Sequence, residues 1–148
     1  MLDEIIIGAV TSAATTTIHA LAMASVIRAT KLAGSKPHLN PSALLIITMI
    51  AAVLVLMAAH TLEVLVWAVA YLVSGAVPPG AGRVYFAFVN YTTLGYGDIT
   101  PVKERQLLGP ITAMNGVLLF GWSTAVIFEV LRQTLAQTDA NPVSRRGV

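Results

Sequence analysis

Three long apolar runs, separated by polar and turn-rich segments, set the pattern of this chain. The runs cover residues 5–27, about 43–73 and about 107–131. Each exceeds the roughly 20 residues that a helix needs to cross about 30 Å of hydrocarbon. The first run carries no charged residue and is rich in Ala, Thr and Ser, which suits close helix packing. The pattern therefore predicts three membrane-spanning helices.

Composition strengthens this prediction and excludes other classes of protein. The chain is 56% hydrophobic and 11% charged, whereas a soluble domain carries about 25% charged residues. It has no cysteine, so disulfides and thiolate metal sites are excluded. Its net charge of +2 gives no argument for nucleic acid as a partner. The sequence also lacks nucleotide, phosphate-cradling and nucleophile motifs, so we expect no enzymatic activity and no cofactor.

The segment between the second and third runs holds a short apolar stretch and a glycine-rich motif. Residues 83–93, RVYFAFVNYTT, allow about three helical turns. This stretch is too short to cross a membrane, so we expect a helix that enters and returns. Residues 93–98 read TLGYGD, in which Gly95 and Gly97 permit backbone angles that other residues avoid. Consecutive carbonyl groups can then face one axis and replace the water around a dehydrated cation.

This order of helix, re-entrant helix, TLGYGD and helix resembles the pore module of the potassium channel family. The resemblance implies an all-α membrane protein with three transmembrane helices, a re-entrant pore helix and a selectivity filter. It also implies a homotetramer in a lipid bilayer, with K⁺ as the permeant ion. The expected divisions are an accessory helix (1–33), a cytoplasmic linker (34–42), a pore module (43–133) and a cytoplasmic tail (134–148). Within the pore module we expect an outer helix at 43–74, a pore helix at 83–93, a filter at 93–98 and an inner helix at 104–132.

The resemblance also implies roles for individual residues around the filter. Backbone carbonyls would bind K⁺ along the stretch Thr93, Leu94, Gly95, Tyr96 and Gly97, with the Thr93 hydroxyl at the innermost site. The filter would be supported by Tyr85, Phe86, Thr92 and Asp98. Leu94 replaces the commoner valine, but only its carbonyl faces the ion.

One position departs from the family pattern. Many members carry an acid four residues before the filter threonine, hydrogen-bonded to the aspartate. Here that position is Val89. Asp98 must therefore find another partner or face water.

The second run contains two ionisable residues, His60 and Glu63, on one helix face. Such groups are expensive inside a membrane and usually face protein. In one interpretation Glu63 reaches the pore helix near Asn90 or Tyr91 and replaces the missing acid. In a second, the pair responds to pH; in a third, it makes a structural hydrogen bond between helices. His19 of the first run could complete a three-residue zinc site with the pair.

The third run holds further candidates, each with two interpretations. The resemblance implies a bend of the inner helix at a glycine near Gly116 or Gly121, although glycine also permits tight helix packing. Asn115 would face either the cavity below the filter or a neighbouring helix. Glu129 would form an acidic ring at the inner mouth or an ion pair with Arg132.

Basic residues near the ends of the runs predict the orientation. One side would hold Arg28, Lys31, Lys36, Arg132, Arg145 and Arg146, and the other Arg83, Lys103 and Arg105. This bias favours a cell-membrane protein with its N-terminus outside and its C-terminus in the cytoplasm. No run has arginine at every third position, as the usual voltage sensor requires. Two rival functions are a weakly selective monovalent cation channel and a non-conducting membrane subunit that uses the loop for assembly.

Overall fold

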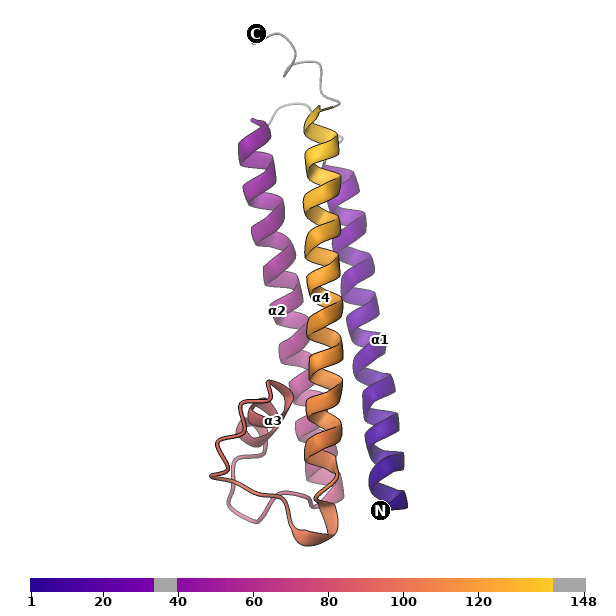
Figure 1. Cartoon of the computed structure of the whole chain (residues 1–148), viewed down its shortest axis with the longest axis vertical. Helices are drawn as coiled ribbons and strands as arrows, with labels where there is room; N and C mark the ends of the chain where they lie inside the picture. The colour runs from indigo at the N-terminus through magenta and orange to yellow at the C-terminus, as the bar shows by residue number, and fades with distance from the viewer. Residues whose placement is uncertain (34–39, 140–148) are drawn as a thin grey trace. The chain divides into compact units, whose positions relative to one another are not determined.

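The computed structural model describes residues 1–33 and 40–139, and in this part of the chain it contains helices and no strand. The elements are α1 (Leu2–Ala33), α2 (Pro41–Ser74), α3 (Arg83–Tyr91), the 3₁₀ turn η1 (Lys103–Arg105) and α4 (Leu108–Asp139), as Figure 1 shows. The predicted all-α fold is therefore confirmed. Lys36, Arg145 and Arg146, which entered the orientation argument, lie outside the described residues, as does most of the predicted linker.

Three of the helices are long and apolar enough to cross a membrane, over Leu2–Leu32, Ser42–Ser74 and Lys103–Gln137. The start of α2 follows from its sequence: Pro41 opens the helix, and the Asn40 side chain accepts a hydrogen bond of 3.1 Å from the Ser42 amide. The helix stops at Gly75, whose φ of +64° is left-handed and unsuited to an α-helix.

Some predicted bounds differ from those in the structure. The pore helix ends at Tyr91 and not at residue 93, because Thr93 has a φ of +60°. The inner helix does not begin at residue 104, since Lys103–Arg105 forms a 3₁₀ turn and α4 starts only at Leu108. It also continues beyond residue 132 to Asp139, so the first part of the predicted tail is helical.

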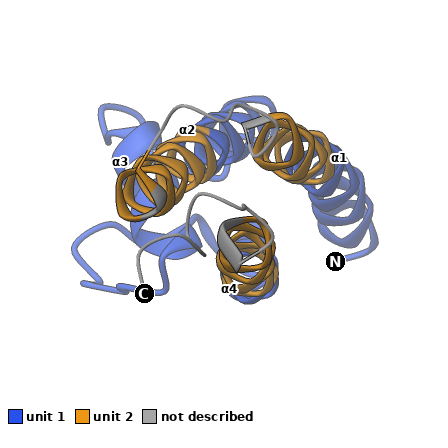
Figure 2. Cartoon of the chain, turned by 90° about the horizontal axis from the view of Figure 1, so that it is seen from above, with its two compact units in different colours: residues 1–19, 59–121 blue, residues 20–58, 122–148 orange. Residues whose placement is uncertain are grey.

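The described chain divides into two compact units, coloured separately in Figure 2. Unit 1 comprises Met1–His19 and Ala59–Gly121. Its core is built around large buried side chains: Trp67, Tyr71, Phe86, Tyr91 and Leu108. The Tyr71 and Phe86 rings meet edge to face with centroids 4.9 Å apart, so α3 is packed against α2 by an aromatic contact.

Unit 2 comprises Ala20–Ala58 and Trp122–Val148. Its core takes small and aliphatic side chains from α1, α2 and α4: Met23, Val26, Ala52, Leu56, Val126 and Val130.

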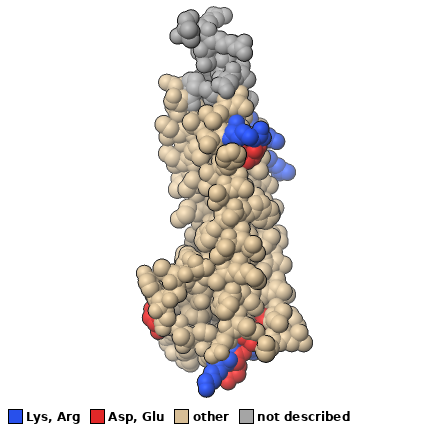
Figure 3. Space-filling model, viewed as in Figure 1, with Lys and Arg blue, Asp and Glu red and all other residues tan. Residues whose placement is uncertain are grey.

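On the face drawn in Figure 3, charged side chains form a few small groups and most of the described surface is uncharged. Such a surface suits contact with lipid.

Candidate functional site

The loop formed by residues 93–98, here called the 93–98 loop, has positive φ angles at alternate residues. Thr93, Gly95 and Gly97 have φ angles of +60°, +59° and +74°. Leu94 and Tyr96 lie between them and have no positive φ. Among the described non-glycine residues, Thr93 alone has a positive φ. A regular strand points successive carbonyl groups to opposite sides. Alternation between left- and right-handed residues instead turns successive peptide groups to the same side.

The N-terminal end of this loop is hydrogen-bonded to the last turn of α3. The amides of Leu94 and Gly95 both donate to the Val89 carbonyl, at 2.9 and 3.4 Å. The Thr93 amide donates to the Asn90 carbonyl at 3.0 Å. Thr92 ends the helix, and its hydroxyl donates to the Phe88 carbonyl at 2.7 Å. These bonds use the carbonyls that a helix end leaves unpaired, so the loop begins from a fixed position.

The loop is uncovered in the single chain. All residues from Thr92 to Asp98 are exposed, including two with large apolar or aromatic side chains. Leu94 is 54% and Tyr96 67% exposed.

The C-terminal end of the loop is also hydrogen-bonded to α3. Asp98 accepts a hydrogen bond of 2.7 Å from the Tyr85 hydroxyl, and its other carboxylate oxygen accepts one of 3.1 Å from the Ile99 amide. Asp98 therefore has the alternative partner that Val89 cannot supply. The neighbouring carboxylate raises the pKa of Tyr85, because a phenolate would be repelled by it and would lose this bond. Phe86 is buried in the core of unit 1 and does not share the exposed position of Tyr85.

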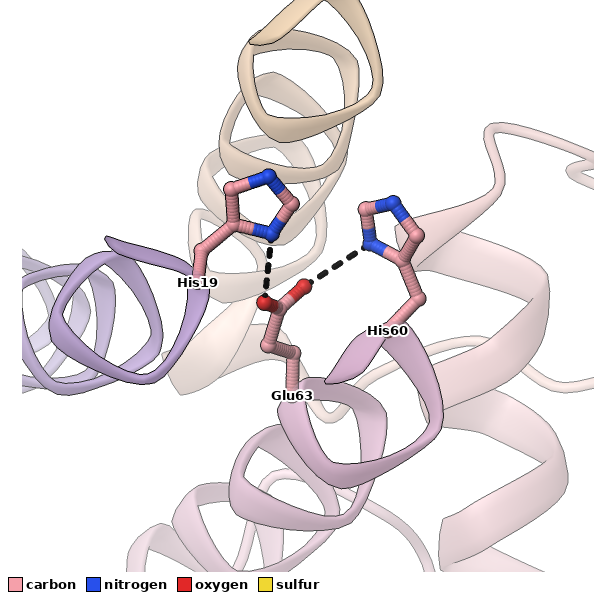
Figure 4. A group of neighbouring side chains, drawn as sticks. All are labelled: His19, His60 and Glu63. Atoms are coloured by element: carbon pink, nitrogen blue, oxygen red, sulfur yellow. Dashed lines mark hydrogen bonds and ion pairs between the residues drawn. The ribbon is translucent and has the colours of Figure 1, made fainter. Parts of the chain in front are cut away.

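Behind α3, three ionisable side chains converge inside unit 1 (Figure 4). The Nδ1 atoms of His19 and His60 each lie 2.9 Å from a different oxygen of the Glu63 carboxylate. The Tyr91 hydroxyl donates a short hydrogen bond to Glu63 and lies 3.0 Å from His60 Nδ1. The predicted contact between Glu63 and the end of the pore helix is thus confirmed. A pH response of His60 and Glu63 stays a prediction.

Asn115 of α4 is turned toward the neighbouring helices of unit 1. Its side-chain oxygen accepts hydrogen bonds of 3.0 Å from both Thr15 and the indole nitrogen of Trp67. The residue is 5% exposed. Of the two orientations considered for Asn115, the contacts are those of the second, in which it faces neighbouring helices.

Gly116 and Gly121 have very different surroundings. A Cβ atom on Gly116 would fall far inside the contact distance of the Tyr91 carbonyl oxygen. A Cβ on Gly121 would meet nothing within 4 Å. Gly116 therefore lets α4 approach the end of α3 closely, and α4 itself is a continuous helix through both glycines.

Glu129, in unit 2, is paired within its own helix. Its two carboxylate oxygens accept bonds from Arg132 at 2.7 and 2.8 Å, and Gln133 donates a further bond at 2.6 Å. The ion pair proposed as one of its two roles is present. An acidic ring at an inner mouth remains a prediction.

Apart from His19, the polar stripe of α1 that faces the core of unit 1 was not predicted from the sequence. Glu4, Thr11, Thr15 and His19 are all buried. They are spaced by seven, four and four residues, which places them on one face of the helix. Polar residues at helical spacing within an apolar span are the signal that would have identified this face. The Glu4 carboxylate, for example, accepts a bond of 2.9 Å from the Leu107 amide.

The described chain thus has a short helix of nine residues and an exposed loop between two long apolar helices, an arrangement compatible with a membrane channel fold. A family model described as "Ion channel" matches residues 43–133, which is more than half of the chain. The chain therefore belongs to this ion channel family and is a multi-pass membrane protein. The match spans α3, the 93–98 loop and most of α2 and α4, and leaves α1 outside. Comparisons with curated proteins and with solved structures found no match.

Proposed function

We propose that the protein is a potassium-selective channel. Four copies of the chain would surround one axis, and K⁺ would pass down its electrochemical gradient through the ring of 93–98 loops. The positive φ angles at Thr93, Gly95 and Gly97, which alternate with Leu94 and Tyr96, carry this proposal. They are the backbone geometry with which main-chain oxygens from Thr93 to Tyr96 can replace the hydration shell of a bare ion.

Four copies are required because one loop supplies only one wall of a coordination cage. The exposure of Leu94 and Tyr96 supports this step, since neighbouring copies would cover both side chains. Closed rotational symmetry is the common arrangement of identical subunits around a shared axis. The C-terminal end of α3 would then add its partial negative charge on the inner side of the ring.

The orientation rests on the placement of basic residues. Six basic residues fall on one predicted side (Arg28, Lys31, Lys36, Arg132, Arg145 and Arg146), against three on the side of the 93–98 loop (Arg83, Lys103 and Arg105). By the positive-inside rule, the ends of the helices with more basic residues would face the cytoplasm. The N-terminus and the loop would then face the outside of the cell membrane.

The test is ion flux through the purified full chain in liposomes, with K⁺ or Na⁺ as the permeant ion. We expect K⁺ flux that exceeds Na⁺ flux, and a fourfold assembly by light scattering in detergent. Gly97→Ala should abolish most of the K⁺ flux, because a left-handed residue with a Cβ is strained by about 1–2 kcal/mol. Gly82→Ala is the matched control, since Gly82 has a φ of −73° and an added Cβ would meet no atom closer than 3.6 Å.

The two rival functions give different outcomes in the same experiment. Equal K⁺ and Na⁺ flux through the wild-type chain would indicate a weakly selective cation channel and contradict potassium selectivity. No flux from a fourfold assembly would favour a non-conducting subunit. An assembly without four copies would overturn the proposed pore.

A further inference from the structure

We propose that His19, His60 and Glu63 form a binding site for a divalent transition-metal ion of the Zn²⁺ type. One ligand atom from each of the three residues lies within 4.8 Å of the other two. Figure 4 shows both imidazole rings with Nδ1 turned to the carboxylate that lies between them. In a tetrahedral zinc site with bonds of about 2.0–2.2 Å, neighbouring ligand atoms lie about 3.4 Å apart. The three groups need only small side-chain movements to reach that geometry.

The ligand chemistry fits this class of metal. Two imidazole nitrogens and one carboxylate oxygen are a recurring set for Zn²⁺ and leave one position open. The set contains no thiolate, so it does not select Cu(I) or an iron–sulfur cluster. Mg²⁺ and Ca²⁺ prefer oxygen ligands, of which the three residues supply only the carboxylate.

The charge of the cluster gives an independent argument. Glu63 and His19 are fully buried, in two helices that are each long and apolar enough to span a membrane. The contacts of the Glu63 carboxylate are His19, His60 and Tyr91, and none of these side chains carries a permanent positive charge. A buried carboxylate is costly unless a cation compensates it. Either a proton shared with the histidines or a bound metal ion can do so.

The surroundings also match those of metal sites. The Tyr91 hydroxyl donates a hydrogen bond to Glu63, and contacts of this kind orient the carboxylates that bind metals. The His60 side chain is 12% exposed, whereas the side chains of His19 and Glu63 are fully buried. The bound ion would join α1 to α2 beside Tyr91, the last residue of α3. It would therefore attach the helix outside the family match to the pore module.

The experiment measures metal content, so its outcome does not depend on channel activity. The tag-free full chain in detergent is stripped with a chelator, dialysed against Zn²⁺ and analysed by mass spectrometry for bound zinc. We expect about one zinc ion per chain. His19→Gln and His60→Gln should each weaken zinc binding by at least tenfold, since even the loss of an outer contact costs roughly 10–100-fold.

The matched control is His38→Gln, which removes the third histidine of the chain; His38 lies outside the described residues. It should bind zinc as the wild-type chain does. Co²⁺ provides a second measurement on the wild-type chain alone, and we expect the intense visible absorption of a tetrahedral site. No zinc above the level of the His19→Gln/His60→Gln double variant would overturn the proposal. An octahedral Co²⁺ spectrum, or an equal loss in His38→Gln, would also overturn it by indicating adventitious binding only.

Discussion

The Tyr85 hydroxyl and the Asp98 carboxylate are joined by a hydrogen bond of 2.7 Å. Tyr85 lies in the first turn of α3, and Asp98 is the last residue of the 93–98 loop. The bond connects the C-terminal end of the loop to the start of α3. The N-terminal end of the loop is held by main-chain hydrogen bonds to the Val89 carbonyl. The loop is thus fixed at both ends by the same helix.

Tyr85→Phe should weaken the attachment of the C-terminal end of the loop to α3. The substitution keeps the aromatic ring and removes only the hydroxyl, so Asp98 loses a donor. We expect K⁺ flux through the purified channel to start near the wild-type rate and to decline faster during sustained conduction. The measurement is the time course of flux in liposomes.

A double-mutant cycle separates this bond from other effects of the ring. Asp98→Asn alone should also speed the decline, and the Tyr85→Phe/Asp98→Asn pair should be little worse than either single variant. Val84→Ala alters the neighbouring, half-exposed residue and should leave the time course unchanged. Fully additive effects of the two substitutions would contradict a shared interaction.

The same bond predicts that the Tyr85 phenol loses its proton at a higher pH than an ordinary tyrosine. Asp98 raises the pKa of Tyr85, above the ordinary tyrosine value of about 10. The pKa of Tyr85 is higher in the folded state than in the unfolded state. The bond therefore contributes fully to folding stability below about pH 10, and this contribution is lost as pH rises through the folded-state pKa. The difference in phenolate absorbance between wild type and Tyr85→Phe isolates this group among the four tyrosines. Asp98→Asn should bring the titration back toward pH 10, and a Tyr85 that ionises below pH 10 would contradict the assignment.

The sequence was sufficient for the helices because each long helix coincides with a long apolar run. The helix ends were less predictable. The end of α3 at Tyr91 depends on the positive φ of Thr93, and nothing in a threonine favours that angle. The length of α4 beyond residue 132 was also missed, because its last turns are polar and their apolar pattern is weak.

At the site, local spacing predicted the pair His60 and Glu63, and one of three interpretations placed Glu63 near Asn90 or Tyr91, of which Tyr91 is its hydrogen-bond partner. The partners from α1 could not be placed in this way. His19 meets Glu63 across 44 positions of sequence, and Thr15 meets Asn115 across 100. Only the packing of three helices decides such contacts, and no motif records it.

Asn115→Leu should destabilise the protein by removing an acceptor from two donors. The number and branching of the side-chain heavy atoms are kept, but the buried Trp67 indole nitrogen loses its 3.0 Å bond. We expect a loss of about 1 kcal/mol, since hydrogen bonds between membrane helices average about 0.6 kcal/mol and an unpaired buried donor adds to the cost. The measurement is the midpoint of thermal or detergent-induced unfolding.

Trp67→Phe is the companion substitution for Asn115→Leu. In the double variant the indole donor is absent, and the Thr15 hydroxyl still reaches the Thr11 and Ser12 carbonyls, so the two losses should not add. A variant with unchanged unfolding and altered single-channel conductance would contradict the observed orientation. It would instead favour Asn115 as a residue of the cavity below the 93–98 loop.

Gly116→Ala and Gly121→Ala form a matched pair on α4. An alanine Cβ at position 116 would overlap the Tyr91 carbonyl oxygen, so α4 and the end of α3 must move apart. We expect a loss of about 1–3 kcal/mol from overpacking and a reduced K⁺ flux, because the 93–98 loop begins from that end of α3. At position 121 the added methyl group meets no atom within 4 Å, and alanine favours a helix by about 1 kcal/mol over glycine. Gly121→Ala should therefore keep or raise the unfolding midpoint. If it abolished channel opening while Gly116→Ala conducted normally, Gly121 would act as a hinge and the packing role of Gly116 would be wrong.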